Sequence, residues 1–250
     1  MDPRPLWLAG RFLSRLPFPE PRDITPAHLG RMVLYYPWIG LLLGVLIAAV
    51  GLPLGAVDPG VGAAIILILW VWSTGALHLD GLADTADAWI GGMGSRERTL
   101  EIMKDPRSGP AAITTLLLVL IAKWAGLHAL LIADHIGLVL LVPLLARAAL
   151  PMLMLLTPYA RPQGIASDQI AHLPRRSAWA SILAALLLAP LLAGWVGLVL
   201  GLATLVLFWS ARRALLARLG GFTGDTAGAL VELTETLLLL LLAVLIGAPD

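Results

Sequence analysis

The chain has 250 residues, of which 59% are hydrophobic and only 13% charged, and its mean hydropathy is +0.88. Soluble domains average roughly 25% charged residues, so this composition indicates an integral membrane protein in one helical bundle, a single transmembrane domain over residues 1–250. The absence of cysteine excludes disulfides and thiol chemistry, and the formal net charge of +1 does not point to a nucleic-acid partner.

The first twenty residues predict an amphipathic helix on the membrane surface. Arg11 and Arg15 interrupt the apolar stretch, and no small-residue cleavage site precedes the first long apolar run, which excludes a secretory signal. On a helix Arg4, Arg11 and Arg15 align, opposite a surface that includes Leu6 and Leu13. A plain solvated tail is the alternative for this segment.

Apolar runs predict an all-α bundle of about seven transmembrane helices. The expected spans are 34–54, 61–79, 111–132, 136–156, 178–193, 195–211 and 229–247. The uncharged stretch from Ala178 to Trp209 would be about 48 Å long as one straight helix, well beyond a hydrocarbon core of roughly 30 Å. Because Pro190 and Gly194 interrupt it, this stretch can instead form two helices of a hairpin.

The distribution of basic residues favours the hairpin. Basic residues precede the first span, follow the second and fourth, and precede the last, whereas the connections near 55–60, 133–135 and 190–194 contain none. Only the hairpin places every basic loop on one side, with the N-terminus cytoplasmic. Lys123 and Arg147 lie within predicted spans. Lys123 is interpreted as snorkelling or pairing, and Arg147 either snorkels or meets an acid.

Three aspartates follow the second predicted span without an intervening basic residue: Asp80, Asp84 and Asp87. On a helix, at about 100° per residue, they fall within roughly 60° of one another, so their side chains point into one space. Like charges held that close repel unless a cation lies among them. Mg²⁺ fits best, because a few carboxylates hold it while water and substrate phosphates complete its shell. A solvated charged loop is the alternative, and His78 is either a ligand or proton carrier or simply hydrogen-bonded.

Basic residues downstream of the aspartates are candidate phosphate ligands. Pro106 disfavours helix at Asp105, so Lys104 and Arg107 are expected on a turn that faces the same polar space. Acids for a metal and bases for phosphate oxygens together make a magnesium-diphosphate site. Arg161, in Tyr159-Ala160-Arg161-Pro162, offers a further phosphate contact. An ordinary loop is the alternative for all three basic residues.

A second acidic cluster occurs in the segment from Gly220 to Glu235. Asp225 and Glu232 are seven residues apart and share a helix face, while the neighbouring glycines would allow close backbone approach. Thr223 precedes Asp225 and is a candidate substrate contact. Glu232 and Glu235 lie at the start of the last span, where ionisable residues are costly. The topology puts this cluster on the same side as the aspartates, so we expect one site; packing glycines with interfacial acids are the alternative.

At these residues the chain resembles the cobalamin synthase family, the adenosylcobinamide-GDP ribazoletransferases. The resemblance covers essentially the whole chain and rests on four segments in family order: His78 to Asp87, Arg96 to Arg107, Tyr159 to Pro162, and Gly220 to Gly228 with Glu232. Two departures are Ala88, where the family often has Gly, and Pro106, where a Ser is common. They leave the carboxylates intact but put a hydroxyl contact at 106 in doubt.

The resemblance implies a magnesium-dependent transferase of cobalamin nucleotide-loop assembly. Such an enzyme joins adenosylcobinamide-GDP to α-ribazole, or to its 5′-phosphate, and releases GMP. The implied catalytic and metal-binding residues are Asp80, Asp84, Asp87, Asp225 and Glu232, and the implied substrate-binding residues are Lys104, Arg107, Arg161 and Thr223. The implied location is a multi-pass position in the lipid bilayer of a bacterial or archaeal cell (inner) membrane, with the site facing the cytoplasm. A homo-oligomer is left open.

Two other classes of function compete with this interpretation. CDP-alcohol phosphotransferases do similar chemistry, but their Asp-x-x-Asp-Gly-x-x-Ala-Arg pattern is absent. An ion transporter would place carboxylates near the bilayer midplane, often on interrupted helices with internal repeats. Here the acids are predicted at one edge of the membrane and no repeat is evident, so both alternatives are less favoured.

Overall fold

The structure, a computed structural model, describes residues 2–161 and 164–247 and is built from helices. The helices are α1 Arg4–Leu13, α2 Pro26–Met32, α3 Tyr36–Leu54, α4 Pro59–Thr74, α5 Leu77–Gly91, α6 Arg96–Ile102, α7 Pro110–Ile132, α8 Leu141–Leu156, α9 Ile165–Ala171, α10 Arg175–Leu219 and α11 Gly224–Gly247. Short 3₁₀ turns, η1 Val33–Tyr35 and η2 Ile136–Leu140, precede α3 and α8. The predicted all-α polytopic membrane fold is confirmed.

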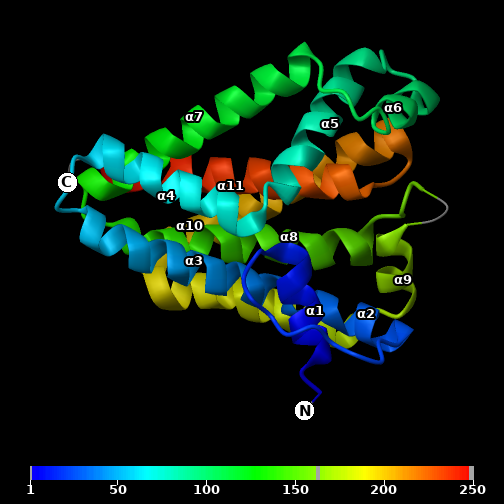
Figure 1. Ribbon diagram of the computed structural model, residues 1–250, viewed down its shortest axis with the longest axis horizontal. Coiled ribbons are helices and arrows are strands. Elements are labelled where there is room, and N and C mark those ends of the chain that lie inside the picture. The colour runs from blue at the N-terminus through cyan, green and yellow to red at the C-terminus, as the bar shows by residue number, and fades with distance from the viewer. Residues whose placement is uncertain (1, 162–163, 248–250) are drawn as a thin grey trace.

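The long helices lie roughly side by side along the longest axis of the molecule, with α8 at the centre (Figure 1). Five helices are long and apolar enough to cross a membrane, and the bent pair α4 and α5 raises this to six if the pair is one span. Every residue of α8 from Leu141 to Leu155 is buried, because α3, α10 and α11 pack around it. A helix buried on all sides needs no polar face, which explains why α8 is apolar apart from Arg147.

Helix α10 is a hairpin, as the charge distribution predicted. Backbone angles are non-helical at Ala193 and Gly194, and a side chain at Gly197 would overlap the backbone of Ala189, which shows that the chain doubles back there. At the other end of the hairpin, the guanidinium groups of Arg175 and Arg212 donate hydrogen bonds to the adjacent carbonyls of Leu155 and Leu156. A straight helix would hold these two arginines roughly 55 Å apart. Counting both legs of α10, and α4 without α5, gives the seven apolar segments expected.

The second span departs from its predicted limits of 61–79. Helix α4 ends at Thr74, because Gly75 and Ala76 adopt left-handed backbone angles with φ of 63° and 57°. Helix α5 then leaves at 88° to α4. Arg15 lies against this bend, and its backbone N–H donates to the carbonyl of Ser73 at 2.7 Å. We therefore end the second membrane-spanning segment at Thr74 and treat α5, which carries the three aspartates, as lying outside it.

The N-terminal segment forms a helix, α1, as predicted. Its apolar face packs onto the bundle, where Ala9 and Leu13 are fully buried, while Arg11 and Arg15 remain exposed. A position flat on the membrane surface stays a prediction. The last span starts five residues earlier than expected, at Gly224, so Asp225 and Glu232 both belong to α11.

Candidate active site

Helices α5 and α11 cross at unusually close range because both have glycine at the contact. A Cβ on Gly81 would lie 2.7 Å from the backbone oxygen of Asp225, and one on Gly228 would lie 3.3 Å from the Cα of His78. The two helices therefore meet backbone to backbone. This crossing brings the aspartates of α5 next to the first turn of α11, so the expected meeting of the two acidic segments is confirmed for Asp225.

A small backbone bridge positions Arg161. The amide of Phe222 donates to the carbonyl of Pro158 at 2.9 Å, and the amide of Ala160 donates to the carbonyl of Phe222 at 2.8 Å. Gly221 permits this approach, since a side chain there would overlap the carbonyl of Pro158. The bridge joins two segments more than sixty residues apart, and it carries the Arg161 guanidinium to 2.6 Å from the Asp225 carboxylate.

Thr223 acts mainly on the backbone of α11. Its hydroxyl accepts from the amide of Thr226 at 3.2 Å, and the Thr226 hydroxyl accepts from the Thr223 amide at 2.8 Å. This reciprocal pair caps the N-terminus of the helix. The Thr223 side chain is fully buried and also lies 3.4 Å from the Asp225 carboxylate, so its position supports Asp225. A direct substrate contact stays a prediction.

A cavity of about 310 Å³ opens at the crossing of α5 and α11. One polar wall contains His78, Asp80, Arg161 and Asp225, and the other lining residues come from α1, α3, α5, α8, α9 and α11, with Tyr159, Gly164 and Phe222. His78 is 4% exposed, and its Nδ1 has no hydrogen-bond partner among the residues the structure describes. The cavity therefore combines carboxylates, one guanidinium and an imidazole on a mostly apolar surface, the pattern typical of a small-molecule site.

Asp84 adjoins this cavity, and the neighbouring carboxylates affect its pKa. Partial burial together with the negative charges of Asp80 and Asp225 raises the pKa of Asp84 to about 6. No group of three such side chains is already close enough to hold a metal in the described part of the chain. The excess of negative charge fits Mg²⁺ nonetheless, because this ion takes one or two carboxylates and completes its shell with water and phosphate oxygens.

The Asp87 carboxylate binds the start of α7 instead of lining the cavity. It accepts hydrogen bonds from the amides of Gly109 at 2.5 Å and Ala112 at 2.9 Å, at the N-terminus of α7. An acid at this position satisfies otherwise unpaired N–H groups and interacts favourably with the helix dipole. The expectation that all three aspartates point into one space is therefore wrong for Asp87, because α7 begins opposite the last turn of α5.

Lys104 and Arg107 do not reach the cavity. Arg107 pairs with Asp105 at 2.7 Å while its side chain stays 87% exposed, and this neighbouring guanidinium lowers the pKa of Asp105 to about 2. Lys104 is exposed on the same turn. The turn forms as the proline at 106 predicted, but both side chains point to solvent, so the expectation that they face the aspartates is wrong.

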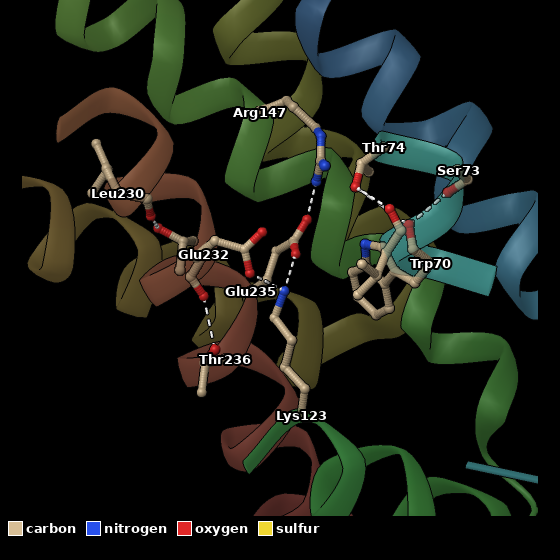
Figure 2. Close-up of polar contacts among 11 residues, drawn as sticks. Trp70, Ser73, Thr74, Lys123, Arg147, Leu230, Glu232, Glu235 and Thr236 are labelled. Carbon is tan, nitrogen blue, oxygen red and sulfur yellow. Dashed lines mark hydrogen bonds and ion pairs between the residues drawn. The ribbon is translucent and has the colours of Figure 1, made fainter. Parts of the chain in front are cut away.

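Glu232 belongs to a second cluster, deeper in the bundle and separate from the cavity lining (Figure 2). Lys123 of α7 donates to Glu232 and to Glu235 of α11, each at 2.5 Å, and Arg147 of α8 donates to Glu235. All four side chains are at most 5% exposed. The expectation that Glu232 joins Asp225 in one site is therefore wrong. The two residues share a helix face, but seven residues of α-helix rise about 10 Å, which is enough to place Asp225 at the cavity and Glu232 in the buried ion-pair cluster.

This four-residue cluster settles the alternatives for Lys123 and Arg147, since both pair with acids. A sequence signal for it existed. Two basic residues inside spans and two acids inside another span must find one another, because unpaired charges in a membrane are too costly.

Comparison with known proteins places the chain in one family. A family model described as cobalamin-5-phosphate synthase matches residues 5–243. A relative from Pseudomonas paraeruginosa, named adenosylcobinamide-GDP ribazoletransferase, is 54% identical over 95% of this chain and 97% of its own length. Proteins of the same name from Stutzerimonas stutzeri and Pseudomonas fluorescens are 50% and 47% identical, covering 97% and 96% of this chain and 99% and 98% of their own. No solved structure matches the chain.

Proposed function

Because the chain belongs to the cobalamin-5-phosphate synthase family, we propose that it joins adenosylcobinamide-GDP to α-ribazole or its 5′-phosphate and releases GMP. The observation that links this reaction to particular residues is the cavity, which Asp80, Arg161 and Asp225 all line. In the reaction a ribose hydroxyl oxygen forms a bond to the cobinamide-side phosphorus. The bond from that phosphorus to the bridging oxygen of the diphosphate breaks, GMP leaves with the electron pair, and the hydroxyl gives up one proton.

Asp80, Asp84 and Asp225 are the residues that would hold Mg²⁺. The carboxylates of Asp80 and Asp84 accept no hydrogen bond from any described residue, so their oxygens are available to a metal. Partial burial and the negative charges of Asp80 and Asp225 raise the pKa of Asp84. Bound Mg²⁺ would offset charge on the diphosphate as GMP departs. Asp87 serves as a cap for α7 in this proposal, and Glu232, already paired with Lys123, is not part of the metal site.

Arg161 is the phosphate-binding residue of the cavity. In the absence of substrate it pairs with Asp225, which keeps the guanidinium pointed at the carboxylates rather than at solvent. A planar guanidinium can bind two phosphate oxygens at once, so it orients the diphosphate beside the acids. Lys104 and Arg107, exposed at the same end of the molecule, are left to contact the part of the large corrinoid substrate that stays outside the cavity.

The cavity is proposed to face the cytoplasm from a bacterial inner membrane. The segments that build it, 157–161 and 220–223, lie at the end of the bundle where the basic connections gather, away from the turns at 55–58 and 133–135, which contain no Lys or Arg (Figure 1). Basic connections remain on the cytoplasmic side of membranes.

Turnover by the purified protein tests this function. Release of GMP from adenosylcobinamide-GDP would be measured with α-ribazole present or absent, in detergent or liposomes, across a Mg²⁺ titration and with EDTA. We expect GMP release to require both α-ribazole and the metal. Asp80→Asn should lower kcat by at least about 100-fold, as loss of one preorganised charge contact typically does.

The matched control is Glu97→Gln, which makes the same chemical change at an exposed position of α6. This variant should retain the wild-type rate. Full activity of Asp80→Asn at limiting Mg²⁺ would remove the carboxylates from the mechanism, and GMP release independent of α-ribazole would contradict the transferase assignment.

A further inference from the structure

The cavity has a second polar region that the reaction described above does not use. Tyr36 at the start of α3 and Gln169 on α9 both line it, and they are 0% and 1% exposed. The Tyr36 hydroxyl lies near the Gln169 side chain but forms no hydrogen bond of normal geometry with any described residue. A buried hydroxyl without a partner costs free energy, so this region presents an O–H donor to a bound ligand.

The surfaces around Tyr36 suit a flat aromatic group. The rings of Phe12 and Tyr36 are stacked, with centroids 6.0 Å apart and planes inclined by 22°. Leu13, Leu150 and Met154 complete this part of the wall. Aromatic faces and flexible apolar side chains favour a planar, mostly apolar ring system over a charged or strongly polar one.

We propose that Tyr36 is a specificity-determining residue that donates a hydrogen bond to the base of α-ribazole, with Gln169 beside it. This inference rests on the proposed function. The base of α-ribazole is a methyl-bearing benzimidazole, a fused aromatic ring system with one free ring nitrogen that accepts a hydrogen bond and no N–H donor. One O–H donor on an apolar wall matches that pattern.

The other parts of the two substrates fit this region poorly. Guanine carries several donors and acceptors, most of which would be left unpaired against Leu13, Leu150 and Met154. A corrinoid is several times larger than a nucleoside, and 310 Å³ lies at the small end of ligand-site volumes. This part of the cavity is therefore the site of the base of the acceptor nucleoside, beside the end where Arg161 binds the diphosphate. A base held between α1, α3 and α9 leaves its ribose toward Asp80, Arg161 and Asp225.

A substrate analogue isolates the proposed hydrogen bond. In the corresponding indole riboside, a C–H group replaces the accepting ring nitrogen and the shape is kept. GMP release would be measured for wild type and Tyr36→Phe with each acceptor, at saturating adenosylcobinamide-GDP. Wild type should show a KM roughly tenfold lower for α-ribazole than for the indole analogue, the usual effect of one buried hydrogen bond. In Tyr36→Phe that preference should fall to about one, with kcat and the KM for adenosylcobinamide-GDP unchanged.

Two further variants make the result specific. Tyr35→Phe removes the same oxygen from the preceding residue, which does not line the cavity, and should keep the wild-type preference. Gln169→Leu should raise the KM for α-ribazole without affecting that for adenosylcobinamide-GDP. If Tyr36→Phe raised KM equally for both acceptors, or changed neither, Tyr36 would have only a structural role and the proposal would be wrong.

Equilibrium binding separates this inference from the proposed function. Binding of α-ribazole to wild type and Tyr36→Phe would be measured by calorimetry without the second substrate. Weaker binding to Tyr36→Phe, with the indole analogue bound equally by both proteins, would support the nucleoside site even if no GMP were released. Equal binding of α-ribazole by both proteins would overturn it even in an active enzyme.

Discussion

Asp80, Asp84 and Asp87 share one face of α5, yet each carboxylate meets a different environment. Asp80 lines the cavity, Asp84 adjoins it among other acids, and Asp87 binds the backbone amides at the start of α7. The periodicity of a helix correctly predicts the common face. What each side chain does there depends on the element packed opposite, and for Asp87 that element begins with unpaired N–H donors.

The four-residue cluster of Lys123, Arg147, Glu232 and Glu235 is a stability feature at the residue scale. It is formally neutral, and it joins α7, α8 and α11 in the interior of the bundle. Burying a charge is costly, and removal of one partner leaves another charge uncompensated. Each of the four side chains is therefore stable in the interior only while its charged partners are present.

Replacement of Lys123 should destabilise the fold strongly. Lys123→Met leaves Glu232 without an ion-pair partner and Glu235 with Arg147 alone, and we expect a loss of about 3–5 kcal/mol in the free energy of unfolding. Thermal unfolding of the purified protein in detergent would measure it. Lys104→Met, the same change at an exposed position, should have little effect. The double variant with Glu232→Gln should recover part of the loss, and an unchanged Tm for Lys123→Met would show that the cluster does not stabilise the protein.

At the scale of elements, glycines decide how close the site-forming segments come. Gly81 and Gly228 set the approach of α5 to α11, and Gly221 sets the approach of the 220–223 segment to Pro158. These contacts involve backbone rather than flexible side-chain ends, so a neighbour cannot give way by changing rotamer. The spacing of Asp80, Arg161 and Asp225 therefore depends on residues that carry no functional group.

Gly81→Ala should impair catalysis more than folding. Its new Cβ would lie 2.7 Å from the backbone oxygen of Asp225, so α5 and α11 must move apart by a fraction of an ångström. Displacement of catalytic groups by about 1 Å can cost 100-fold in rate, and we expect kcat to fall at least tenfold. Rates of GMP release and Tm would be compared with those of Gly137→Ala, where an added Cβ meets no atom within 4 Å. Equal, wild-type rates in both variants would show that this close crossing is not needed.

At the scale of the whole molecule, one end of the bundle holds both the basic connections and the cavity, and the other end holds neither. The cavity lies at the end with the basic connections, where Arg175 and Arg212 also bind the end of α8, and the turns at the opposite end carry no Lys or Arg (Figure 1). Charge asymmetry of this kind orients a polytopic chain in the membrane. The same asymmetry therefore determines from which side the substrates arrive.

Single cysteines would test this orientation, and the cysteine-free chain supplies a clean background. Ser108→Cys, beside the cavity end, should react with an impermeant thiol reagent only after spheroplasts are lysed. His135→Cys, in the turn at the opposite end, should react in intact spheroplasts. Both positions are exposed, so access to the side chain is not limiting. The reverse pattern would place the cavity outside the cytoplasm.

Features encoded locally were predictable from the sequence alone. Apolar runs located the spans, loop charges predicted the α10 hairpin, and a helical period placed the aspartates on one face, because hydropathy and periodicity act over short stretches of chain. Tertiary packing decided the partners: Asp87 with the start of α7, Glu232 with Lys123, and Tyr36 with the cavity. These contacts join residues far apart in the chain, and each depends on how closely the helices approach, which no local pattern records.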